Sequence, residues 1–163
     1  MNRCASAVIS VVLAVTCALG TTSCGNRNFD VYGRIGGGVS EDSGTEPGKA
    51  CHFLDGVVRV GDRMNLTGEQ GRMLGSVELE PGIMDRSACE LLYQFRGIRP
   101  GESMYTLELE SRAYPAVHAS EQDLRADMAN LQIRSQSDIW FAKAQGRPIP
   151  PSIHMAPFNL HKK

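Results

Sequence analysis

The chain has 163 residues and almost balanced charge, with 17 Lys and Arg against 18 Asp and Glu and a formal net charge of −1. This length suits one domain with a sizeable core and is short for two. The balance of charge excludes recruitment of nucleic acid or anionic lipid by net charge.

The first 23 residues have the order of a secretory signal. A short positive start, Met1 to Arg3, is followed by an apolar run over residues 5–19 and then by small residues. The run is shorter than the roughly 20 residues that a membrane-spanning helix needs. We therefore expect residues 1–23 to be a signal peptide and the chain to be exported.

Cys24 follows Ser23 and precedes Gly25. This segment resembles the lipobox of bacterial lipoproteins, in which the cysteine is acylated with palmitate and becomes the new N-terminus. Thr21 stands where the lipobox usually has an aliphatic residue, and the alternative is an ordinary cleaved signal that leaves Cys24 as a free thiol. We predict lipidation at Cys24, a linker over residues 24–28, and attachment to the outer face of the cell membrane.

The first ordered element is expected directly after this linker. Phe29, Val31 and Ile35 share one face of an alternating segment, which predicts a strand over residues 29–35. Residues 36–48 are rich in glycine and polar side chains and predict a loop. No helix pattern follows that loop, so a phosphate-binding glycine loop is not expected.

Cys51 and Cys89 are the cysteines that remain after the signal and Cys24. Cys89 begins an alternating segment in which Leu91, Tyr93 and Phe95 share its face, as in a half-buried strand. If that face meets a second sheet, Cys89 reaches Cys51, and an exported chain favours a disulfide that stabilises the fold by about 4 kcal/mol. The alternative, a pair of metal-binding thiolates, lacks the short paired spacing of such sites.

The other predicted elements are strands, with one short helix. Residues 63–67 and 72–80 form a hairpin through the turn at Gly68 to Gly71, and Pro81 and Gly82 end its second strand. Residues 104–112 alternate clearly, Ser120 is a helix N-cap, and residues 131–134 form a closing strand. The sequence predicts an all-β domain over residues 29–135: an antiparallel, Ig-like or transthyretin-like β-sandwich of about seven strands with one short C-terminal helix.

Residues 136–163 contain four prolines and are predicted to be a C-terminal tail without long regular structure. Trp140, next to Phe141, is the one tryptophan of the chain. It either packs against the domain or is an exposed aromatic anchor for a partner.

The order of these features resembles a group of small exported actinobacterial proteins, many of them lipoproteins of the mycobacterial kind. The features are a Phe-x-Val-x-Gly strand at Phe29, the hairpin ending in Pro-Gly, the Cys-x-Leu-x-Tyr-x-Phe strand at Cys89 and the Tyr-x-Leu-x-Leu strand at Tyr105. The resemblance covers residues 29–133. It implies a β-sandwich domain of unknown function with a Cys51–Cys89 disulfide, and no catalytic residue.

No arrangement of side chains in the sequence points to catalysis, and we predict no catalytic residue, no metal ligand and no cofactor. The four histidines are His52, His118, His154 and His161, and none is paired at helical ligand spacing. We expect a monomeric, non-enzymatic cell-envelope module that binds an envelope protein or glycolipid through residues 36–48 or the tail. The alternative is a cell-wall hydrolase in which His118 or His52 meets a carboxylate and a hydroxyl, and a small apolar ligand between the sheets is a third possibility.

Overall fold

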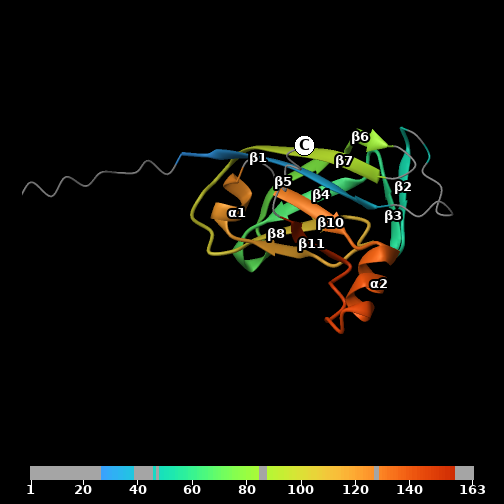
Figure 1. Cartoon of the computed structure of the whole chain (residues 1–163). Coiled ribbons are helices and arrows are strands. Elements are labelled where there is room, and N and C mark those ends of the chain that lie inside the picture. Colours follow the sequence, from blue (N-terminus) through green and yellow to red (C-terminus); the bar gives the residue numbers. More distant parts are fainter. Residues whose placement is uncertain (1–26, 39–45, 47, 85–87, 127–128, 157–163) are drawn as a thin grey trace, which may run out of the picture.

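The computed structural model describes residues 27–38, 46, 48–84, 88–126 and 129–156, and it is mostly β (Figure 1). One sheet has the strand order β11 (Ile153–Ala156), β10 (Ala129–Ile133), β1 (Phe29–Gly38), β7 (Ala88–Ile98) and β6 (Glu80–Met84). A second sheet has the order β5 (Met73–Glu78), β4 (Arg63–Thr67), β8 (Tyr105–Leu109) and β9 (Val117–Ala119). The strands β2 (Ala50–Phe53) and β3 (Gly56–Arg59) form a separate hairpin, and the helices are α1 (Glu121–Arg125) and α2 (Gln136–Ala144).

The two larger sheets share one hydrophobic core. Alternate residues of β1 and β7 face it, among them Val31, Leu91 and Phe95, and β4 and β8 contribute Leu66 and Leu107 from the other side. These side chains are fully or almost fully buried, as the period-two pattern of each strand requires when one face meets a second sheet. The alternation read from the sequence therefore assigns the correct inward face of β1, β7 and β8.

A disulfide joins Cys51 of β2 to Cys89 of β7, with their Cα atoms 5.6 Å apart. Both cysteines are completely buried. The predicted bridge is confirmed, but it does not connect the two larger sheets. It fastens the β2–β3 hairpin to the five-stranded sheet.

Tyr93 holds the centre of the five-stranded sheet together. Gly33 of β1 pairs with Tyr93 of β7 on one side and with Ala129 of β10 on the other. The Tyr93 hydroxyl donates a hydrogen bond of 2.6 Å to the carbonyl oxygen of Ala129, so the ring crosses over β1 at Gly33. Burial raises the pKa of Tyr93 well above its ordinary value. A side chain at position 33 would overlap this ring.

The prediction of an all-β fold is confirmed, and three of its details were wrong. The described residues contain eleven strands rather than about seven, because several short strands lack clear alternation. The pairing is not wholly antiparallel, since β1 and β10 are parallel neighbours. The same described ranges contain two α-helices rather than one.

Residues 136–156 are not a tail without regular structure. They contain α2, and β11 pairs antiparallel with β10 at the edge of the five-stranded sheet. The prolines at 148, 150 and 151 lie between these two elements, where no ladder hydrogen bond is lost. Two strand boundaries also differ from the prediction. Strand β1 continues through Gly38 into the expected loop, and Pro81 and Gly82 lie inside β6 rather than ending a strand.

We predict that replacing both Cys51 and Cys89 by alanine lowers the free energy of unfolding by about 4 kcal/mol, because the bridge spans 38 positions of sequence. Urea unfolding measures this loss. Reductant should destabilise the wild type and leave the double variant unchanged. A loss below about 1 kcal/mol would show that the hairpin is held by packing alone.

We further predict that Gly33→Ala destabilises the protein by about 1–3 kcal/mol or more, because the new Cβ overlaps the Tyr93 ring and the Ala129 carbonyl. Gly38→Ala is the matched control on the same strand, since a Cβ there would lie 3.5 Å from the Cβ of Ser135, an ordinary contact. Thermal unfolding compares the two variants. Equal stability would contradict the role given to Tyr93.

Candidate functional site

Helix α2 begins at a capping box and exposes most of its surface. The Ser135 side chain accepts a hydrogen bond from the backbone of Asp138, and the Asp138 carboxylate accepts one from the backbone of Ser135. Ala142 is its one buried residue. Trp140 is 63% exposed and Phe141 54% exposed, and their rings lie edge to face with centroids 5.0 Å apart. We call these two exposed rings the aromatic patch.

The residues before α2 fix the helix at one end of the domain. The Arg134 side chain pairs with Asp55 at 2.7 Å and donates a hydrogen bond of 2.9 Å to the carbonyl of Pro150. Asp55 belongs to the turn between β2 and β3, which the disulfide also holds in place. The start of α2 is therefore tied to the hairpin and to the segment that leads into β11.

The aromatic patch lies at the end of the domain opposite the start of β1. Gly38, the last residue of β1, lies against Ser135, the N-cap of α2. The ten residues of β1 rise about 3.3 Å each, so Phe29 lies about 30 Å away along the strand. Figure 1 shows α2 projecting from the body, far from the point where β1 begins.

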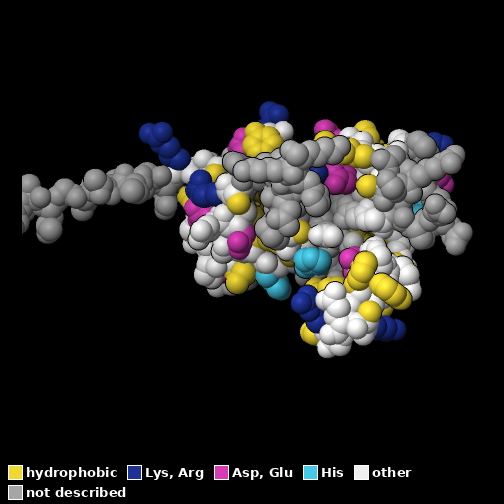
Figure 2. All heavy atoms as spheres, viewed as in Figure 1, with side chains coloured by type: hydrophobic (Ala, Val, Ile, Leu, Met, Phe, Trp, Pro, Cys, Tyr) yellow, Lys and Arg dark blue, Asp and Glu magenta, His cyan; other side chains and the backbone are white. Residues whose placement is uncertain are grey.

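Positive charge surrounds the aromatic patch. Lys143 and Arg147 are exposed on and just after α2, while the carboxylate of Asp138 is used in the helix cap. Figure 2 shows hydrophobic side chains gathered on α2 with Lys and Arg side chains beside them. Aromatic and arginine side chains are enriched in protein-binding hot spots, and Trp140, Phe141 and Arg147 match this composition.

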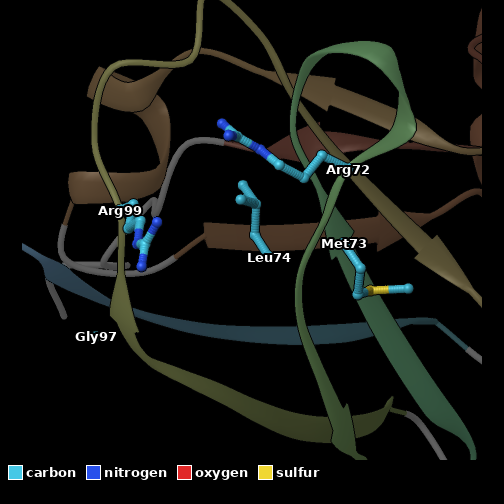
Figure 3. A pocket seen from close by; sticks show the side chains of 5 residues that line it. All are labelled: Arg72, Met73, Leu74, Gly97 and Arg99. Carbon is cyan, nitrogen blue, oxygen red and sulfur yellow. The ribbon is translucent and has the colours of Figure 1, made fainter.

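A different surface lies at the end where β1 begins. A hollow of about 170 Å³ is lined by Met73 and Leu74 of β5 with Arg72 just before them, and by Gly97 of β7 with Arg99 just after that strand. In Figure 3 the side chain of Leu74 lies between the two arginines, and Met73 points away from the hollow. Gly97 has a φ of +64°, so the chain turns here in a conformation that glycine adopts without strain.

Two carboxylates near this end are held in their ionised form. The backbone N–H of Glu69 donates to Glu102 at 2.8 Å, and this bond, with the adjacent Arg72 guanidinium, lowers the pKa of Glu102. The backbone N–H of Gly101 donates to Glu121 at 2.9 Å, and together with Arg125 it lowers the pKa of that carboxyl. These bonds order the loop between β7 and β8.

The histidines are spread over the domain. His118 Nδ1 and Thr106 Oγ1 are 3.0 Å apart on the exposed faces of β9 and β8. His52 lies on β2 and His154 on β11, while His161 lies outside the described residues. In the described ranges, no group of three or more His, Cys, Asp or Glu side chains could hold a metal ion. The hydrolase alternative stays a prediction from the sequence.

The predicted lipidation site, Cys24, lies outside the described residues, as does most of the expected loop over residues 36–48. In the part of the chain that the structure describes, no helix is long and apolar enough to span a bilayer. No protein-family model, curated protein or solved structure matches the chain. The resemblance to exported actinobacterial lipoproteins therefore stays a prediction.

One of these two surfaces has a signal in the sequence and the other has none. Adjacent Trp140 and Phe141 indicate a possible aromatic anchor, although their pattern does not predict the helix that presents them. Arg72 and Arg99 stand 27 positions apart in the numbering, next to glycine turns that look like ordinary loops. Only the packing of β5 against β7 brings these two arginines to one hollow.

We predict that Glu102→Gln destabilises the protein near neutral pH and that this difference shrinks in acid. A carboxyl whose folded-state pKa is below its ordinary value of 4.5 contributes stability above that value and loses it as pH falls through the lowered pKa. Urea unfolding over an acid pH series measures the difference. Glu110→Gln, which replaces an exposed carboxyl just after β8, is the control and should have no effect. A difference that persists in strong acid would assign the effect to packing instead of charge.

Proposed function

We propose that the chain is a lipid-anchored, extracytoplasmic binding module of the cell envelope, and that it is not an enzyme. In this proposal Cys24 carries the acyl anchor on the outer face of the cell membrane. The two packed sheets form an Ig-like or transthyretin-like β-sandwich, which serves as a rigid support for the binding surface. The two sheets' shared core and the buried disulfide support this rigid role.

The observation that carries the proposal is the exposed aromatic patch. A nine-residue helix that buries only Ala142 gains little from packing, yet Arg134 and the Ser135 capping box hold it in a fixed position. Exposing a tryptophan and a phenylalanine side by side costs solvation free energy unless a partner covers them. A patch of this kind is typical of a binding surface.

The side chains of the aromatic patch and its neighbours indicate the chemistry of the partner. Trp140 and Phe141 require an apolar cleft, and Lys143 and Arg147 favour acidic groups at the rim of that cleft. We therefore propose that the partner is an envelope protein with an apolar cleft rimmed by acidic groups. This partner binds a monomer of the chain. A glycolipid partner is a distinct outcome of the test below.

The position of the patch fits an anchored protein. The proposed anchor at Cys24 precedes Phe29 by five residues, whereas α2 lies near the far end of β1. An acylated Cys24 would hold the start of β1 close to the membrane and direct the patch away from it. A partner in the envelope could then reach the patch without displacing the anchor.

We predict that a photoreactive amino acid at Gln145, one turn after Phe141, forms a defined crosslink to one envelope protein in the living host. Phe141→Ser should reduce that crosslink about tenfold or more, as the loss of a hot-spot side chain does. Ile83→Ser is the matched control, because Ile83 is 55% exposed on β6 and Phe141 is 54% exposed on α2. Immunoblotting and mass spectrometry of the crosslinked species provide the measurement.

Three outcomes would contradict the proposal in different ways. Equal loss in both serine variants would show a nonspecific contact. A crosslink to glycolipid would replace the protein partner. Mass spectrometry of the protein purified from its host tests the anchor separately, and an unmodified Cys24, or a mature chain that lacks it, would rule out lipidation.

A further inference from the structure

The hollow between Arg72 and Arg99 lies at the end of the domain from which the proposed anchor leaves. The N–H of Gly97, which lines the hollow, donates to the Asp30 carboxylate at 2.8 Å, and Phe29 pairs with Ile98. Asp30 follows Cys24 by six residues, so an extended chain places these two residues at most about 20 Å apart. If Cys24 is acylated, the hollow lies within reach of the bilayer surface.

The charges of the hollow suit a group with a single negative charge. Arg72 pairs with Glu102, which offsets its charge, whereas Arg99 has no ion pair among the described residues. The Asp30 carboxylate, behind Gly97, accepts hydrogen bonds from the Gly97 N–H and the Tyr32 hydroxyl and keeps its negative charge. The charged side chains that line the hollow itself are Arg72 and Arg99, and their planar guanidinium groups suit a phosphate diester.

Exposed apolar side chains accompany the charged groups at this end. Leu74 lies between the two arginines (Figure 3), Met73 is 56% exposed next to Arg72 in the chain, and Met104 is 46% exposed. Met104 precedes Tyr105, whose hydroxyl donates to the carbonyl of Arg99. Exposed methionines next to arginines match a phospholipid, which presents acyl chain and glycerol beside its phosphate, better than they match a free anion.

We infer that the hollow lined by Arg72, Leu74 and Arg99 binds the phosphate of an anionic phospholipid, so that this end of the domain rests on the bilayer. The inference depends on the proposed anchor and adds a second membrane contact to it. A second contact near the anchor forms within one molecule, so it needs little intrinsic affinity to hold this end of the domain against the bilayer. The nearly neutral net charge of the chain does not oppose this contact, because the contact acts over a few ångströms within the hollow, whereas net charge acts at long range.

The test compares hydrogen exchange of the protein purified from its host and inserted through its anchor into two kinds of vesicle. One kind is pure phosphatidylcholine, and the other contains phosphatidylglycerol. Insertion of the acyl chain is the same in both, so any difference in exchange reports the headgroup. We expect slower exchange at residues 71–74 and 97–101 in the anionic vesicles. Arg99→Gln should reduce that protection about fivefold, as expected for the loss of one arginine at an anionic surface.

Arg63→Gln is the control, because Arg63 is exposed at the start of β4 and outside the hollow, and it should leave the protection unchanged. Equal exchange in the two vesicles, or loss of protection in both variants, would overturn the inference. Equal protection by inorganic phosphate with phosphatidylcholine vesicles would replace lipid by free phosphate. If Cys24 proves unmodified, the proposed anchor fails, but flotation of the protein with added vesicles still tests the hollow. Binding to anionic vesicles that is abolished by Arg99→Gln would support the lipid site. No binding to anionic vesicles would overturn it.

Discussion

The hydrogen bond from Tyr93 to the carbonyl of Ala129 fixes the arrangement on which the rest of the structure depends. To make this bond the ring of Tyr93 crosses β1, and only a glycine at position 33 leaves room for it. Three strands, β7, β1 and β10, are thereby joined at one point of the sheet. The bond is buried, and its loss would leave a polar hydroxyl in an apolar core at a cost of about 1–3 kcal/mol.

The position of α2 follows from this arrangement. Because β10 pairs parallel with β1, it ends beside the last residues of β1, and the chain turns into α2 at that end. Arg134 then pairs with Asp55 on the β2–β3 hairpin, which the Cys51–Cys89 bridge holds against β7. The aromatic patch is thus positioned by a chain of contacts that begins in the core, although the patch itself touches little of the core.

The two ends of the domain differ in their chemistry, and the difference matches the proposed function. The end at the start of β1 presents arginines with apolar side chains between them. The end at α2 presents aromatic rings bordered by basic groups. An anchored module requires one surface compatible with the membrane and another open to a partner, and a long central strand separates the two.

The sequence by itself determined the all-β character, the inward faces of the strands around Leu91 and Leu107, and the Cys51–Cys89 bridge. These features depend on local period-two patterns and on the small number of cysteines, which a single chain displays directly. Only the tertiary structure decided the parallel pairing of β1 with β10, the return of residues 153–156 into the sheet, and the meeting of Arg72 with Arg99. Strand order and shared hollows arise from contacts between residues that are distant in sequence. Such contacts produce no periodic pattern in the sequence, so a single chain does not display them.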